Sequence, residues 1–154
     1  MIFQQEGKRL IMVTSMGVAI EKGKVSFAVI CGQSMNDCFL KSCRTFNFNP
    51  DDIHLMTQFN NFFNEVITKF VPDVIGYKLA SHMNLKNDQI HYLYEPNGIL
   101  RLLCEQKGIK IRQVSAAYIQ NKKSQRISKF KEKFEGNFNK GILEAGVIAW
   151  EGIG

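Results

Sequence analysis

The sequence predicts an α/β domain in which three antiparallel strands are followed by parallel strands, with helices flanking the mixed sheet. The chain has 154 residues, of which 45% are hydrophobic and 22% charged, as is usual for one globular domain. Its first third is rich in residues that favour strands, and its middle alternates between strand and helix patterns. We therefore expect residues 1–154 to form a single domain.

The first third of the chain has the pattern of an antiparallel meander. Met16–Ile20 and Val25–Ile30 are short apolar runs, and Gly23 between them supplies the positive φ angle of a tight turn. A third strand is expected around Cys38–Phe48. The segment Met1–Arg9 has no decisive pattern, which leaves either an extra strand or a frayed tail.

A long amphipathic helix is predicted next. Asn49-Pro50-Asp51-Asp52 combines a capping side chain, a proline and two carboxylates, all of which favour a helix start. Val71-Pro72-Asp73 ends the helix. Apolar residues recur between these limits at spacings of three and four, and they are expected to face the core. They are Ile53, Met56, Phe59, Phe63, Val66, Ile67 and Phe70.

The middle of the chain has the pattern of a βαβ unit. Val74–Tyr77 is a short apolar run, and it is followed by a polar stretch over Lys78–Gln89. A helix is expected from Tyr92 to Lys107, with Gly108 as its stop, and Ile109–Val114 has the composition of a second strand. Because such crossovers are right-handed, the two strands are expected to pair in parallel.

Three more helices are predicted in the last third. Ser115 is expected to cap a short helix over Ala116–Ile119, and Ser124–Phe134 has the composition of a basic helix. Gly141–Trp150 is expected to form a final, apolar helix.

Positive charge is concentrated in one segment. The whole chain carries a formal net charge of +6. The segment from Lys107 to Lys140 contains ten basic residues and only two acidic ones. Such a strip attracts polyanions by counterion release, so DNA or RNA is the first expected partner. A solvated face, or a surface that docks an acidic protein, is the alternative. The residues expected to meet phosphates are Lys122, Lys123, Arg126, Lys129, Lys131 and Lys133.

Other classes of protein and site find little support in the sequence. No apolar run is long enough to cross a bilayer and the first residues lack the order of an export signal, so we expect a cytoplasmic protein with no membrane partner. The four cysteines are expected to be structural thiols. The three histidines are too far apart in sequence for a zinc set, and the common glycine-rich phosphate motifs are absent.

The predicted order of elements is that of the RNase H-like fold, and several segments resemble the RuvC-type Holliday junction resolvases and their small uncharacterised relatives. These segments are Met16–Gly23, Asp73–Lys78, and Gly98–Ile111 with the following Val114-Ser115. Leu143–Ala149 is similar to the last helix of that group. The resemblance implies a nuclease whose two Mg²⁺ ions are held by carboxylates from the first strand, the end of the fourth strand and the last helix.

Carried over residue by residue, this pattern is incomplete. The first-strand acid falls at Ala19, with Glu21 as a substitute two residues further along, and the fourth-strand acid falls at Tyr77. Tyrosine is a poor Mg²⁺ ligand, because its reference pKa is about 10. Only the acid of the last helix has a match, in Glu144. The resemblance therefore implies degenerate metal positions at Ala19 and Tyr77, and leaves Glu21 and Glu144 as candidate catalytic residues.

Our leading hypothesis is that the domain has lost two-metal nuclease activity and binds nucleic acid or a protein partner through its basic surface. One alternative is an active, structure-selective metal-dependent endonuclease with a site rebuilt around Glu21 and Glu144. A second alternative is a regulatory protein-interaction module. We expect no cofactor in the first case and Mg²⁺ if the protein is active. The resemblance also makes a homodimer plausible.

Overall fold

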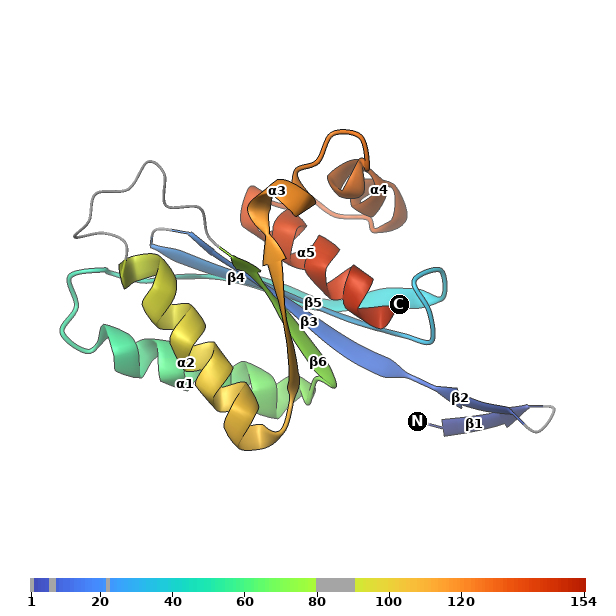
Figure 1. Ribbon diagram of the computed structural model, residues 1–154, viewed down its shortest axis with the longest axis horizontal. Coiled ribbons are helices and arrows are strands. Elements are labelled where there is room, and N and C mark those ends of the chain that lie inside the picture. Colours follow the sequence, from blue (N-terminus) through green and yellow to red (C-terminus); the bar gives the residue numbers. More distant parts are fainter. Residues whose placement is uncertain (1, 6–7, 22, 80–90) are drawn as a thin grey trace.

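A computed structural model describes residues 2–5, 8–21, 23–79 and 91–154, and it has a mixed sheet with helices on both faces (Figure 1). Three segments of the sequence predictions lie partly outside these residues. They are Lys22 in the predicted turn, the stretch over residues 80–89, and positions 1 and 6–7 near the N-terminus. Within the described residues, the predicted α/β class with antiparallel and then parallel strands is confirmed.

Five strands form the main sheet in the order β5-β4-β3-β6-β7. The antiparallel part consists of β3 (Val13–Glu21), β4 (Lys24–Gly32) and β5 (Cys38–Asn47), which confirms the predicted meander. The parallel part consists of β6 (Val74–Leu79), which pairs with β3, and β7 (Lys110–Ser115), which pairs with β6. The parallel pairing predicted across the helical crossover is therefore confirmed.

The N-terminal segment forms an arm outside this sheet. Strands β1 (Ile2–Gln5) and β2 (Lys8–Ile11) pair with each other in antiparallel fashion as a separate two-stranded sheet. Figure 1 shows this arm extending away from the main sheet, beyond the start of β3. Of the two alternatives that the sequence left for this segment, the described residues adopt the strand.

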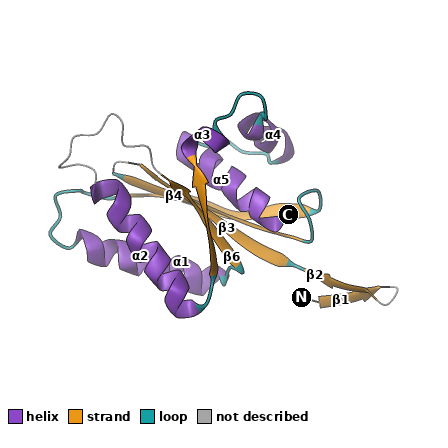
Figure 2. Cartoon of the chain, viewed as in Figure 1, coloured by secondary structure: helices purple, strands orange, loops and turns teal. Residues whose placement is uncertain are grey.

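Different sets of helices cover the two faces of the sheet. On one face lie α1 (Leu55–Phe70) and α2 (His91–Lys107), side by side. The opposite face carries α3 (Ala116–Ile119), α4 (Arg126–Lys133) and α5 (Lys140–Ile153), with α5 directly against the strands (Figure 2). In the described part of the chain, no helix has both the length and the apolar character needed to cross a membrane.

The start of α1 differs from the sequence prediction. The side chains of Asn49 and Asp52 accept hydrogen bonds from backbone amides two residues ahead, at 3.0 and 2.8 Å, and these turns keep the segment out of the helix. The helix therefore begins only at Leu55. Ile53 is 90% exposed and Met56 46% exposed, so the prediction that they face the core was wrong. The later apolar positions, from Phe59 on, are buried as predicted.

Alternation along the strands divides the interior into two cores. In β3, even-numbered residues such as Met16 and Val18 pack with α1 and α2, whereas Ala19 packs with α4 and α5. The core under α1 and α2 is rich in phenylalanine, and its rings lie close together: Phe27, Phe48, Phe59, Phe62, Phe63 and Phe70. The core under α5 contains more small residues.

Two glycines bring α5 into close contact with the sheet. Gly17 of β3 pairs with Gly76 of β6, and both lie beneath α5. A Cβ atom at Gly17 would overlap the carbonyl oxygen of Ala145, and one at Gly76 would overlap the side chain of Ile148. Because neither position has a side chain, the helix backbone rests directly on the strands. This close approach of α5 to the strands sets the position of Glu144, the residue before Ala145.

Candidate functional site

Three elements bring charged residues together on the α5 face of the sheet. Glu21 is the last residue of β3, and Lys78 is the penultimate residue of β6. Lys78 shares a face with Gly76 because side chains two apart on a strand point the same way. Glu144 lies near the start of α5, whose first turn is fixed by the side chain of Asn139, which accepts a hydrogen bond from a helix amide at 2.8 Å.

The ammonium group of Lys78 lies between the two carboxylates. Lys78 Nζ donates a hydrogen bond to Glu144 Oε1 at 3.1 Å, and it lies 4.0 Å from Glu21 Oε1. Gln120 Nε2, from the segment after α3, donates to Glu144 Oε2 at 3.4 Å. Glu144 thus has partners for both of its oxygens.

Burial makes this pairing energetically important. The side chain of Glu144 is 1% exposed and that of Lys78 is 10% exposed, whereas that of Glu21 is 34% exposed. A buried carboxylate without a partner is strongly destabilising, so the burial of Glu144 depends on its pairing with Lys78. The side chain of Glu21 is more exposed as a whole, but its Oε1 is buried without a hydrogen-bond partner in the described part of the chain and lies 4.0 Å from Lys78 Nζ.

The side chains present do not fit the pair of Mg²⁺ ions that the resemblance implies. Mg²⁺ selects oxygen ligands and near-ideal octahedral geometry. Here a cationic side chain already lies between the two acids, where it would repel an incoming ion. Within residues 2–5, 8–21, 23–79 and 91–154, no group of three or more His, Cys, Asp or Glu residues is placed to hold a metal. The charged groups at this point are thus two carboxylates and one ammonium group, which has no electron pair to offer a metal ion.

The positions aligned with metal ligands in the sequence fall on different faces of the sheet. Ala19 is 1% exposed and lies under α5, on the same face as Glu21 and Glu144. Tyr77 is 2% exposed and packs in the opposite core, with α1 and α2. The structure therefore brings Ala19, Glu21 and Glu144 to one face and separates Tyr77 from them.

Sequence reasoning missed Lys78 and Gln120. A usable signal existed for Lys78, since Ile75 and Tyr77 lie two residues apart and therefore share one face of a strand, and both are apolar, which indicates that this face packs in a core. Position 78 must then point to the other face, toward the last helix. No comparable signal existed for Gln120, which lies beyond a helix of only four residues.

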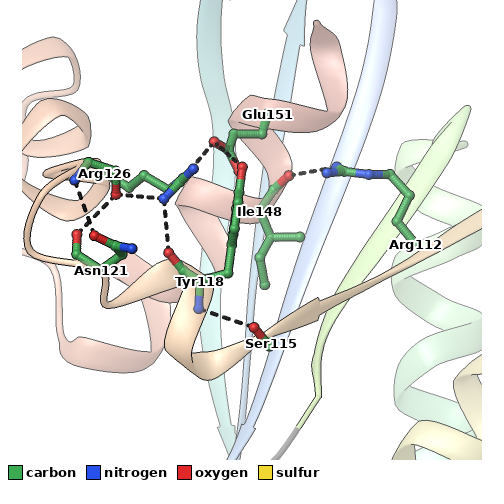
Figure 3. Close-up of polar contacts among 8 residues, drawn as sticks. Arg112, Ser115, Tyr118, Asn121, Arg126, Ile148 and Glu151 are labelled. Atoms are coloured by element: carbon green, nitrogen blue, oxygen red, sulfur yellow. Dashed lines mark hydrogen bonds and ion pairs between the residues drawn. The ribbon is translucent and has the colours of Figure 1, made fainter.

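Among the predicted phosphate-binding residues, Arg126 is engaged inside the protein. Its Nε lies 3.0 Å from Glu151 Oε2, its Nη1 donates to the Tyr118 carbonyl at 3.0 Å, and its guanidinium lies 3.5 Å from the centre of the Tyr118 ring. The Tyr118 hydroxyl also donates to Glu151 Oε2, at 3.1 Å (Figure 3). Arg126 thereby connects α3, α4 and α5.

The lysines of the basic segment divide into two groups. Lys133 donates from Nζ to the Asn36 carbonyl at 3.0 Å, which connects α4 to the turn between β4 and β5. Lys133 is itself exposed, but its ammonium group is held by this contact. The second group is exposed without a contact of this kind to the turn, and consists of Lys122, Lys123, Lys129 and Lys131. The loop that carries the first two is held by Asn121, whose Oδ1 accepts from the Lys123 amide at 2.9 Å. We call these four exposed lysines the basic surface.

Solved structures with the same fold are Holliday junction resolvases. RuvC from T. thermophilus in complex with a Holliday junction substrate has a TM-score of 0.72 and 11% identity, over 91% of this chain and 90% of that one. The yeast mitochondrial resolvase has a TM-score of 0.62 and 12% identity, over 90% and 76%. The fowlpox virus resolvase in complex with junction DNA has a TM-score of 0.56 and 12% identity, over 90% and 97%.

Comparison of the sequence with known families and curated proteins gives no match. No protein-family profile and no curated protein sequence matches the chain. The structural likeness establishes the RuvC-like, RNase H-like fold that the sequence resemblance implied.

Proposed function

We propose that this RuvC-like domain binds nucleic acid without cleaving it. The observation that carries the proposal is the position of Lys78 Nζ, 3.1 Å from Glu144 and 4.0 Å from Glu21. In two-metal hydrolysis the ions activate water and stabilise the leaving oxygen. An ammonium group neutralises the same carboxylates, but it has no coordination sites for water or phosphate. In this proposal Lys78 therefore stabilises the two acids within the fold but does not support phosphodiester hydrolysis.

The basic surface is the proposed contact with the ligand. Lysines that meet phosphates release counterions and bind with little dependence on base sequence. The T. thermophilus and fowlpox virus proteins of similar fold were solved with Holliday junction DNA, which supports a nucleic-acid partner for this fold. Arg126 and Lys133 contribute less in this proposal, because their charged groups already have partners within the protein.

A salt titration tests the binding. Fluorescence anisotropy with duplex DNA should give a log–log slope of affinity against salt of about −4 if four phosphates are contacted. The double variant Lys122→Gln/Lys123→Gln should bring the slope to about −2. Lys69→Gln, on an exposed position of α1 across the sheet, serves as the matched control and should leave the slope unchanged. A flat dependence, or no binding at low salt, contradicts the proposal and favours a protein-interaction module.

An active nuclease is the competing candidate, favoured by the convergence of Glu21 and Glu144 on one point. Such an enzyme would need Lys78 to leave the space between the acids. It would cleave junction, single-stranded or RNA–DNA hybrid substrates with Mg²⁺ or Mn²⁺, and Glu144→Gln would abolish the cleavage. We expect no cleavage in a product assay with purified protein. Metal-dependent cleavage that disappears in Glu144→Gln contradicts the loss of activity.

A further inference from the structure

A cavity of about 220 Å³ lies between α4, α5 and the turn after β4, beside the basic surface. Its apolar wall includes Met35 from the turn, and Val147 and Trp150 from α5. Its polar wall includes Lys129 from α4 and Glu151 from α5. The cavity thus combines an aromatic ring, an exposed cation and a carboxylate within a small space.

The aromatic wall is held in place before any ligand arrives. Trp150 Nε1 donates a hydrogen bond to the Met35 carbonyl at 2.7 Å, which fixes the indole against the turn. The ring also meets Phe134 edge-on, with centroids 5.6 Å apart. A side chain fixed in this way loses little conformational freedom when a ligand binds beside it.

The carboxylate wall has an unused hydrogen-bond acceptor. Glu151 Oε2 accepts from Tyr118 and lies 3.0 Å from Arg126 Nε. Glu151 Oε1 is buried and has no hydrogen-bond partner among the residues that the structure describes. An unsatisfied carboxylate oxygen in such a place is costly. Because Glu151 also lines the cavity, a rotation of its side chain would present this oxygen to an N–H group of a ligand.

We infer that this cavity binds an unpaired base of a nucleic acid. The inference rests on the proposed function and deepens it, because it names the structural feature that the domain selects. A base offers a planar face to the apolar wall, an N–H group to Glu151, and a phosphate that Lys129 reaches at the rim. In paired duplex the base edges are occupied, so a flipped or bulged base is the form that enters.

The size of the cavity agrees with a base rather than a larger ligand. About 220 Å³ is several times the roughly 30 Å³ that one water molecule occupies in the liquid. It is below the range of roughly 300–1,000 Å³ that is usual for pockets holding drug-sized ligands. A single ring system therefore fits inside, and the sugar and phosphate remain outside, next to the basic surface.

Binding to three duplexes tests this inference. One duplex is fully paired, one carries a single bulged adenine, and one carries an abasic bulge with the same backbone. Stacking against an aromatic side chain should make the adenine bulge bind about tenfold more tightly than the other two, measured by fluorescence anisotropy. Met35→Trp, which fills the cavity from a half-buried turn position, should remove this preference and leave affinity for the paired duplex unchanged.

Two further variants separate the possible outcomes. Glu151→Gln removes the charged acceptor at constant size, and should reduce the preference for the adenine bulge. Lys123→Gln should weaken binding to all three duplexes equally, because it removes a phosphate contact alone. Thermal melts establish whether each variant is folded. If Met35→Trp does not fold, the effect of Glu151→Gln on the preference for the adenine bulge decides whether the cavity binds the base.

Each contrary result has a separate meaning. Equal affinity for all three duplexes overturns the base-binding cavity and leaves the proposed function standing. Equal affinity for the adenine and abasic bulges overturns it too, since the backbone alone is then recognised. A preference that survives in the folded cavity variants contradicts the assignment to this cavity. Failure to bind any duplex contradicts the proposed function and the inference together.

Discussion

The two faces of the sheet are packed by different means. The face under α1 and α2 is filled with large apolar side chains, of which Phe59 and Phe63 are almost completely buried. The face under α5 meets the helix through Gly17 and Gly76 and carries a buried ion pair. Large side chains stabilise the first face by burying apolar area. On the second face small residues allow a close backbone approach, which places Glu144 against the strands, so the candidate site lies on the less apolar face.

The largest expected effect comes from adding a side chain beneath α5. Gly17→Val should destabilise the protein by at least about 3 kcal/mol, because its side chain would overlap the backbone of α5 at Ala145. Urea unfolding followed by circular dichroism measures the change. Gly98→Ala in α2 is the matched control, since a Cβ there meets nothing within 4 Å. It should stabilise the protein by about 0.5–1 kcal/mol, because alanine is the better helix former.

Gly17→Val would contradict this view of the α5 face if it melted within a few degrees of the unmodified protein. The helix would then have room to move away from the strands, and the close contact would not determine the position of Glu144.

The second expected effect separates the ion pair from ordinary packing. Glu144→Ala should destabilise the protein by about 3 kcal/mol, because Lys78 would lose its nearest partner in a buried place. The double variant Lys78→Met/Glu144→Met should recover most of this loss, since the buried pair is removed together and only Glu21, whose side chain is 34% exposed, loses its nearest cation. Unfolding free energies of the two variants test this non-additivity.

In this second comparison, equal losses in Glu144→Ala and in the double variant would mean that the pair itself contributes most of the stability. Lys78 would then not be a partner that the buried acid requires.

The smallest effect is expected on the opposite face, at Cys104. Burial raises the pKa of its thiol to about 11, from an ordinary value near 9. The unfolded chain therefore loses this proton first as the pH rises, so stability is fully present below about pH 9 and falls between about pH 9 and 11. The loss should reach roughly 2–3 kcal/mol once the pH passes about 11, and this contribution should be absent in Cys104→Ala. Unfolding free energies of both proteins, measured at several pH values, would reveal no difference in slope if the thiol were not buried in solution.

Much of the fold could be predicted because periodicity and local turn chemistry act within a few residues. The meander, the parallel pairing after the crossover, and the Ser115 cap, which accepts from the Tyr118 amide at 3.1 Å, all follow from such local signals. The start of α1 was misplaced for the same reason, since Asn49 and Asp52 side chains serve turns as well as caps.

The candidate site was less predictable because it is assembled from distant segments. Lys78 and Glu144 are 66 residues apart in the sequence. They meet because of the register between β3 and β6 and the close packing of α5 against these two strands. Alignment by sequence alone placed a ligand position at Tyr77, one residue away and on the other face of the strand. The contacts of Arg126 with Glu151 and Tyr118 could not be predicted either, because a pattern of charges in the sequence does not reveal which cations have partners within the protein.

We propose that the ammonium group of Lys78 takes the place of a divalent ion between Glu21 and Glu144. The most direct test is Lys78→Glu, which supplies a third carboxylate at that point, with Lys69→Glu as the matched control for added negative charge. Isothermal titration calorimetry with Mn²⁺ and with Mg²⁺ should detect binding to Lys78→Glu, and the bound ion should raise its melting temperature. The unmodified protein and Lys69→Glu should give no binding. Comparable binding by the unmodified protein, abolished in Glu144→Gln, would contradict the claim.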